Sequence, residues 1–239
     1  MKFTGPPETG CHSALTQEKE ANMEKKLQVA VLVENHPYDV VGFQKMLDSF
    51  DDCECYVQPI DLFVQDELNQ MNYDTVLYYN MNIPMPGEGS PIRKYMETKL
   101  GTTGQGIVLM HHALLSFKHW DLYTDVSGVR VRLEDGMFQY HQNQTVNVHV
   151  EDGSHPVALG LQDFTIVDET YIIGEPEEPG NQILLTTDNA VSIKKIAWAR
   201  NYRESRVFCT ASGHDAKVYA DPNFRTLLHN ALLWTSGKA

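Results

Sequence analysis

Positively charged residues are scarce in this chain. Its 239 residues include 19 Lys and Arg against 32 Asp and Glu, which gives a formal net charge of −13. Such a balance opposes binding to nucleic-acid phosphates and to anionic lipid surfaces. The basic pairs Arg93-Lys94 and Lys194-Lys195 are isolated, inside segments that resemble a helix and a strand, where solvated faces carry such charges. We therefore expect neither nucleic acid nor a membrane as a partner.

Cysteines and long apolar runs are also few. The four cysteines, Cys11, Cys53, Cys55 and Cys209, give no disulfide framework in a chain of this length, so we expect reduced thiols. No run approaches the roughly 18 apolar residues of a membrane helix. The first residues lack the apolar core of a signal peptide. These absences predict a cytoplasmic protein.

The apolar residues that are present, 42% of the chain, suffice for a full core. Residues 1–25 are rich in Gly, Pro, Glu, Lys and Ser and show no apolar period, which predicts a flexible N-terminal tail. Residues 26–239 are predicted to form a single domain.

Short apolar strands alternate with helical patterns through the first half of the chain. The alternation predicts an α/β fold with a doubly wound, mostly parallel sheet. Residues 129–133 and 145–150 instead alternate apolar with polar side chains, which predicts an inserted antiparallel hairpin. The strands are expected at 27–33, 53–57, 74–79, 106–110, 182–186, 196–199 and 206–210, and the helices at 40–50, 91–100 and 221–234.

Polar residues follow several of these strands directly. The ligand crevice of a doubly wound sheet lies at the carboxyl ends of its strands, so these residues are candidates for a site. They are Glu34 and His36 after the first strand, Asn80 after the third, His111 and His112 after the fourth, and His214 and Asp215 after the last.

Four stretches together resemble the ThuA-like (trehalose utilisation) family: 106–112, 155–161, 168–171 and, most specifically, 196–237. The last contains Gly213-His214-Asp215 and Asp221-Pro222-Asn223-Phe224-Arg225. The resemblance covers roughly residues 27–237. It implies a flavodoxin-like sheet of the class I glutamine amidotransferase type and a link to sugar metabolism.

The cysteine that amidotransfer requires is missing. In amidotransferases a thiolate stands at the corner after the fourth strand and attacks an amide carbonyl. Here that corner holds His111-His112, and Cys209 lies inside a predicted strand, where it packs as a small apolar residue. We therefore do not expect a glutaminase.

Imidazoles and carboxylates are the candidate catalytic groups: His214, His112, His111, Asp168 and Glu169. They suit proton transfer near neutral pH, and His112 with His214 suits a divalent metal such as zinc, although no compact ligand motif occurs. His111 and His112 reach one pocket only if the chain turns between them. Asp168-Glu169 equally suits a solvated turn before a strand.

The candidate substrate-binding residues each have a structural alternative. Glu34 and His36 equally suit the start of a helix, although Asp39 is the better N-cap. Tyr171 and Trp198 suit a core or the wall of a sugar pocket. For the catalytic candidate His214, the structural alternative is a loop histidine that caps the next segment. The set comprises Glu34, His36, Asn80, Tyr171, Trp198 and Asp215.

The resemblance and these residues predict an enzyme of carbohydrate catabolism that acts on a sugar or keto-sugar. Hydrolysis, lyase cleavage and isomerisation all remain open, by histidine acid–base or metal-assisted chemistry. The alternative is a non-catalytic binding or assembly protein on the same fold, with exposed aromatics forming a homo-oligomer surface.

Overall fold

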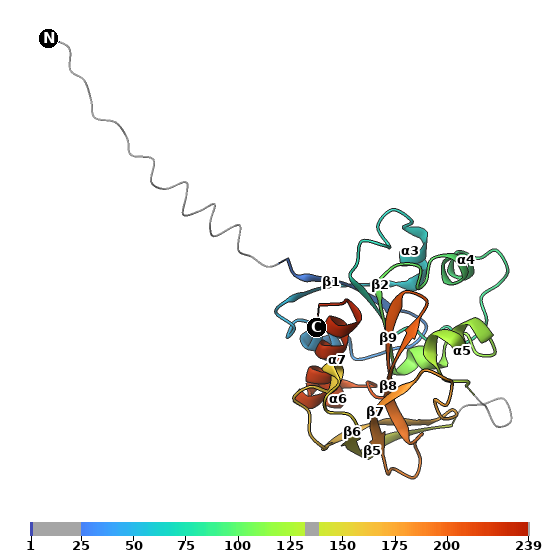
Figure 1. Ribbon diagram of the computed structural model, residues 1–239, viewed down its shortest axis with the longest axis vertical. Coiled ribbons are helices and arrows are strands. Elements are labelled where there is room, and N and C mark those ends of the chain that lie inside the picture. The colour runs from blue at the N-terminus through green and yellow to red at the C-terminus, as the bar shows by residue number, and fades with distance from the viewer. Residues whose placement is uncertain (2–24, 132–138, 239) are drawn as a thin grey trace.

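Nine strands of the described chain form one mixed sheet, in the spatial order β2-β1-β3-β4-β9-β8-β7-β5-β6 (Figure 1). The structure is a computed structural model that describes Met1 and residues 25–131 and 139–238. Apart from its first and last residues, the expected tail lies outside this described part. The strands are β1 (Leu27–Val33), β2 (Cys53–Pro59), β3 (Thr75–Tyr78), β4 (Gly106–Met110), β5 (Gln139–Val150), β6 (Phe164–Ile172), β7 (Gln182–Thr187), β8 (Lys195–Tyr202) and β9 (Ser205–Thr210).

The half of the sheet from β2 to β9 is parallel. Its order, 2-1-3-4 followed by the last strand, is that of flavodoxin-like sheets, so the predicted fold class is confirmed. The strand β1 is almost wholly apolar because five of its seven residues are buried. The helical segments are α2 (Val40–Leu47), α3 (Ile60–Gln65), α4 (Pro91–Thr98), η1 (His111–Leu115), α5 (Asp121–Ser127), η2 (Pro156–Ala158), α6 (Ala216–Ala220) and α7 (Pro222–Thr235).

Side-chain caps fix where two helices begin, as the sequence predicts. The Asp39 carboxylate accepts a hydrogen bond from the amide of Gly42 at 3.0 Å, which starts α2. Asp221 accepts from the amides of Asn223 and Phe224, and Pro222 occupies the first position of α7. The apolar face of α7 then packs against β4 and β9.

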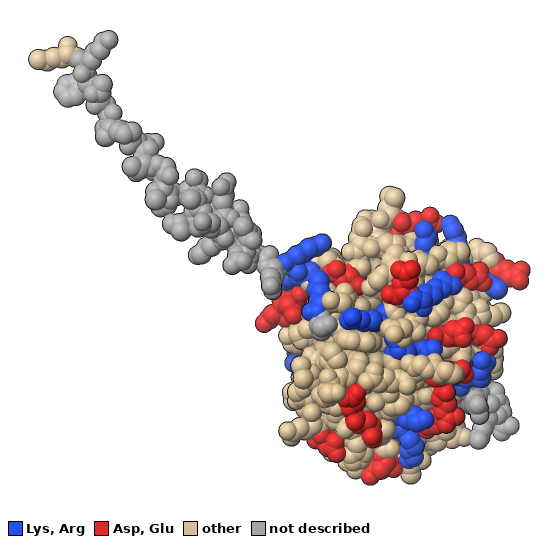
Figure 2. All heavy atoms as spheres, in the orientation of Figure 1, with Lys and Arg blue, Asp and Glu red and all other residues tan. Residues whose placement is uncertain are grey.

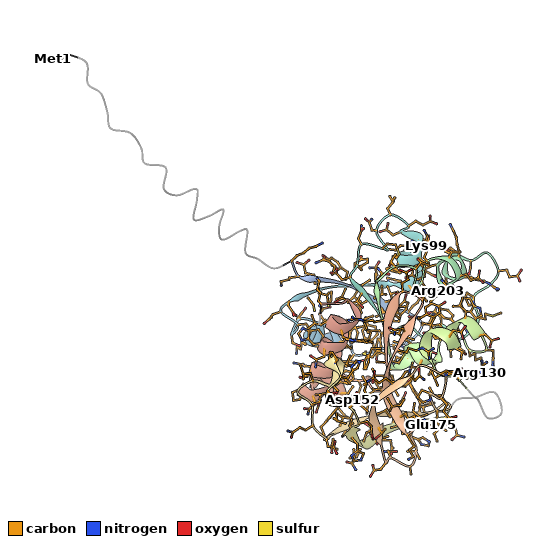
Figure 3. All side chains as sticks on the ribbon, in the orientation of Figure 1. Met1, Lys99, Arg130, Asp152, Glu175 and Arg203 are labelled. Carbon is orange, nitrogen blue, oxygen red and sulfur yellow. The ribbon has the colours of Figure 1, made fainter. Side chains whose placement is uncertain are left out.

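The far end of α4 is tied to the antiparallel half of the sheet. Arg203, in the turn between β8 and β9, donates hydrogen bonds to the carbonyls of Leu100 and Glu97. Figure 3 shows its side chain beside Lys99 at the end of α4. A cation at a helix C-terminus satisfies carbonyls that the helix leaves without partners.

The antiparallel half differs from the predicted hairpin. The strand β5 pairs with β6 on one side and with β7 on the other. Residues 129–131 lie in no strand, while 132 and 133 lie outside the described part. The apolar alternation has another cause, because Val129 is buried and Val131 packs against the core without strand pairing.

Charges of both signs are interspersed over the face of the molecule shown in Figure 2. The face carries no continuous basic area among the residues coloured there. Among the described helices, none combines the length and apolarity needed to cross a lipid bilayer.

His155 gives the fold a pH dependence that can be tested. Its Nδ1 accepts a hydrogen bond from the amide of Val157 at 3.2 Å, and its ring packs against Trp234. Burial lowers the pKa of His155, partly opposed by Asp152. The unfolded chain takes up a proton near pH 6.5 that the folded ring resists, so stability is present above this pH and is lost as the pH falls below it.

We expect the free energy of unfolding to fall by up to about 1.4 kcal/mol per pH unit below about pH 6.5 through this group. The variant His155→Asn keeps an acceptor for the cap but does not titrate, so its stability should depend less on pH. Urea unfolding of both proteins between pH 7.5 and 5.5 measures the difference. If the free energy of unfolding depended on pH equally in both proteins, the His155 ring would take up its proton as readily in the folded protein as in the unfolded chain.

Candidate active site

Four histidines meet at the carboxyl edge of the parallel strands. His36 follows β1, His111 and His112 follow β4, and His214 follows β9. The ring centroids of His36 and His112 are 3.8 Å apart, and the His214 ring lies 5.5 Å from His112 and 5.3 Å from His111. Residues separated by more than 170 positions in sequence therefore form one cluster, as the strand order requires.

The corner after β4 turns sharply enough to bring both of its histidines into the cluster. His111 has a φ of 49°, in the left-handed region that few non-glycine residues adopt. Both rings are buried, with their centroids 4.5 Å apart. Strained backbone of this kind persists where the surroundings hold it in place, and here both imidazoles have defined partners.

A chain of hydrogen bonds fixes the orientation of these two rings. His111 Nδ1 donates to the carbonyl of Ala211 at 2.6 Å. The Tyr171 hydroxyl lies 2.7 Å from His111 Nε2 and 3.0 Å from His112 Nδ1. The hydroxyl oxygen accepts from His112 Nδ1–H, and a hydrogen bond from Tyr171 helps to lower the pKa of Glu169. His112 Nε2 then carries a lone pair.

Two imidazole nitrogens in the cluster are buried without a hydrogen-bond partner: His112 Nε2 and His36 Nδ1. Burial lowers the pKa of both rings, for His112 well below its usual range, so both are neutral at pH 7. One nitrogen from each of His36, His112 and His214 lies within 4.8 Å of the others. Neutral imidazoles that converge in this way are typical metal ligands.

The backbone of His214 is held from two sides. Buried Asp168 accepts hydrogen bonds from the amides of Gly213 at 2.7 Å and His214 at 3.0 Å. The hydroxyls of Tyr79 and Tyr219 both donate to the His214 carbonyl. Gly213 has a φ of 125°, and a Cβ there would lie 3.0 Å from Met110, so only glycine suits the turn. Asp168 thus positions His214 and does not face the cavity described below.

Glu169 lies between two of the histidines. Its carboxylate oxygens are 3.5 Å from His111 Nε2 and 3.6 Å from His214 Nε2. Burial would raise the pKa of Glu169, but hydrogen bonding and charge from His111, with charge from His214, lower it below its usual value. The side chain is therefore an ionised carboxylate, and together with His111 and His214 it forms a second set of possible metal ligands.

A cavity of about 460 Å³ opens beside the cluster. Residues near the ends of β1 and β3 form one wall, and β5 and β6 form the other. Tyr140 and Gln142 of β5 line it, and sequence reasoning missed both because the alternation of β5 does not show which face meets the site. The lining consists of His36, Pro37, Met81, Tyr140, Gln142, Glu169, Tyr171 and His214.

Four of the predicted substrate-binding residues do not line this cavity. Trp198 is wholly buried, and its indole N–H donates to the carbonyl of Ser127, so its place is the core. Asn80 is buried in a clamp with Asn82 and Ser116. The sequence alone could not separate these buried roles from a pocket wall.

The other two are nearer the surface. Asp215 caps α6 by accepting from the amide of Lys217, and lies 4.0 Å from His214 Nδ1. Glu34 is half-buried after β1, and burial, with the charge of Asp61, raises its pKa. Asp168 and Glu169 lie in β6 and are both buried, so the alternative of a solvated turn is wrong.

The fold is that of α/β proteins of the class I glutamine amidotransferase type, and no cysteine stands at the corner after β4, where such proteins hold their nucleophile. Histidines occupy the corner after β4. Cys209 is wholly buried inside β9, and burial raises the pKa of its thiol. The family model for trehalose utilisation, ThuA, matches residues 58–235. The chain therefore belongs to the ThuA family.

Solved structures agree on the fold. A ThuA-like protein from Parabacteroides merdae superposes with a TM-score of 0.71 at 17% identity, over 90% of this chain and 92% of that one. A glutamine amidotransferase from Thermotoga maritima superposes with a TM-score of 0.54 at 9% identity, over 89% of this chain and 99% of that one. A β-galactosidase from Bacillus circulans superposes with a TM-score of 0.59 at 11% identity, over 88% of this chain and 31% of that one. No curated protein matches in sequence.

The Tyr171 hydroxyl should matter to the cluster beyond its effect on stability. In Tyr171→Phe two imidazole nitrogens lose their buried partner, which should lower the free energy of unfolding by about 1–3 kcal/mol. Because the hydroxyl also orients His112, a zinc ion held by this cluster should bind roughly 10–100-fold more weakly to the variant. Tyr78→Phe is the matched control, since its buried hydroxyl contacts Tyr95 and no histidine of the cluster. Isothermal titration calorimetry with zinc that gave equal affinities for the two variants would contradict this role.

Proposed function

We propose that this protein is a zinc-dependent enzyme of carbohydrate catabolism that cleaves or rearranges a sugar or keto-sugar held above the histidine cluster. The observation that carries the proposal is that one nitrogen from each of His36, His112 and His214 lies within 4.8 Å of the others, while His112 Nε2 and His36 Nδ1 are buried without hydrogen-bond partners. A buried polar atom without a partner costs free energy, and a bound cation removes that cost. Membership of the ThuA family supports the link to sugars.

His36, His112 and His214 would hold the ion. Zinc takes imidazole nitrogen, and catalytic sites typically use three protein ligands and keep a further position open. His36 and His214 line the cavity, and His112 lies behind them against the His36 ring, so a ligand in the cavity can reach the open position. A zinc ion held there would act as a Lewis acid toward a carbonyl oxygen of the substrate.

Glu169 is the base in this proposal. Its carboxylate is ionised, lines the cavity, and is fixed between His111 and His214. A general base must be positioned within reach of the proton that it removes, and a carboxylate on a strand is held more firmly than one on a loop. His111, whose two nitrogens have partners, holds Glu169 in place.

The reaction that suits these groups best is elimination from a keto-glycoside. A carbonyl at C3 of the sugar acidifies the C2–H bond. Glu169 takes the C2 proton, the electrons of that bond form a C1–C2 double bond, and the C1–O bond to the leaving group breaks. Glu169 then returns the proton to the departing oxygen, so that no external acid is consumed. Tyr140 offers an aromatic face against which a sugar ring can pack.

Zinc binding is the first test. Chelator-treated protein should gain thermal stability with added zinc, by about 4 kcal/mol when zinc is a thousand times its dissociation constant. His36→Ala and His112→Gln should each weaken zinc binding by more than the 10–100-fold that loss of a supporting group costs. His119→Asn, an exposed histidine outside the cluster, is the control. Protein whose stability ignores zinc would rule out the metal-dependent version.

Turnover is the second test. We expect Glu169→Gln to reduce the elimination rate of methyl 3-ketoglucoside about 10²–10⁴-fold, because the general base is lost, while zinc binding persists. Nuclear magnetic resonance follows the release of methanol. Glu67→Gln, which changes an exposed carboxylate paired with Lys94, should have no effect.

Full activity in Glu169→Gln would place the base elsewhere in the cluster. If zinc-loaded wild-type protein bound keto-sugars without converting any, the non-catalytic alternative would stand instead.

A further inference from the structure

A second cavity adjoins the candidate active site. It also has a volume of about 460 Å³, within the range of small-molecule pockets. Met81 lines both cavities, and Asn35 lines the second while its neighbours His36 and Pro37 line the first. A molecule bound over the histidine cluster can therefore extend past Met81 into the second space.

The chemistry of the second cavity is different from that of the first. Nine residues line it. Apart from Met81 and the two asparagines, the other six are all apolar: Ile83, Pro84, Met85, Pro86, Ile92 and Phe117. No charged residue lines it among those described, whereas Glu169 and His214 line the first cavity. An apolar, uncharged group is the natural occupant.

Hydrogen bonds within the protein hold the wall of this cavity in place. The amides of Phe117 and Lys118 donate to the carbonyls of Asn82 and Ile83, at 2.7 and 3.1 Å. The Ser116 hydroxyl contacts the amide of Asn82 and the carbonyl of Asn80. A wall fixed before the ligand arrives loses little entropy on binding.

A second sugar ring would fit poorly in this space. Its hydroxyls need partners, because a buried polar group without one loses the hydrogen bonds that water supplied. Among the side chains that line this cavity, only Asn35 and Asn82 offer amide groups, and the Asn82 Oδ1 already accepts from Asn80.

We infer that the substrate is a glycoside with an apolar aglycone, whose sugar lies over the histidine cluster and whose alkyl or aryl group fills the cavity bounded by Ile83, Met85, Ile92 and Phe117. This inference rests on the proposed function for the position of the sugar. It adds a specificity subsite, and it separates this chain's substrate from free monosaccharides and from disaccharides.

Binding of unreactive glycosides tests the subsite without any need for turnover. Hexyl glucoside should bind zinc-loaded protein about tenfold or more tightly than methyl glucoside in calorimetry, because its extra methylene groups leave water. A glucose disaccharide should gain no such advantage over methyl glucoside. Equal affinities for hexyl and methyl glucoside, or no binding of hexyl glucoside, would overturn the inference.

Substitutions in the second cavity test whether the alkyl group binds there. Ile92→Thr keeps a β-branched side chain of similar shape, and Met85→Ser changes an exposed position, so both should fold. Each should weaken hexyl glucoside binding several-fold and leave methyl glucoside binding unchanged. Leu68→Ser, a similar change at an exposed leucine outside both cavities, is the control. If Ile92→Thr and Met85→Ser leave the preference for hexyl glucoside intact, the alkyl group lies elsewhere.

Failure of the subsite and failure of the proposed function give different results. Hexyl and methyl 3-ketoglucosides have leaving groups of similar basicity, so a higher kcat/KM for the hexyl compound reports contact with the aglycone. Turnover of both at equal kcat/KM, with equal affinities for the unreactive glycosides, would remove the subsite and keep the enzyme. Preferential binding of hexyl glucoside with no turnover of either keto compound would keep the subsite and remove the proposed reaction.

Discussion

The site depends on the carboxylate of Asp168. In β6 it accepts hydrogen bonds from the amides of Gly213, His214 and its neighbour Glu169, and so ties the loop after β9 to the antiparallel half of the sheet. Burial raises its pKa, with these amides and His111 acting in the opposite direction. Together with the hydroxyls of Tyr79 and Tyr219, which donate to the His214 carbonyl, this contact sets the position of His214 relative to Glu169.

Histidine at the corner after β4 changes what this fold can do. An amidotransferase uses that corner to present a thiolate. Here His111 keeps the left-handed backbone, but its two nitrogens contact the Ala211 carbonyl and the Tyr171 hydroxyl. It therefore supports its neighbours, and His112 is the residue that presents a free nitrogen to the cluster. The corner where an amidotransferase has its nucleophile thus contributes two imidazoles to the cluster of this protein.

Much of the fold follows from local patterns in the sequence. The apolar run of β1 predicts a strand buried on both faces, and Asp39 and Asp221 predict where α2 and α7 begin. These predictions hold because hydrophobic burial and capping act over a few residues. The predicted pairing of residues 145–150 with the segment 129–133 does not hold for the described residues 129–131, because strand partners are set by the whole sheet, and β5 pairs with β6 and β7.

The sequence by itself determined that His36, His112 and His214 follow strands, and that strand ends in a parallel sheet meet at one edge. Only the tertiary structure decided which of them face each other. His36, predicted to contact substrate, packs against His112 with the two rings tilted, while Trp198 turns into the core and Tyr140 faces the cavity. The physical reason is that the direction of a side chain at a strand end depends on the turn that follows and on contacts with residues of β5 and β6. These residues are distant in sequence and meet the turn only when the sheet is complete.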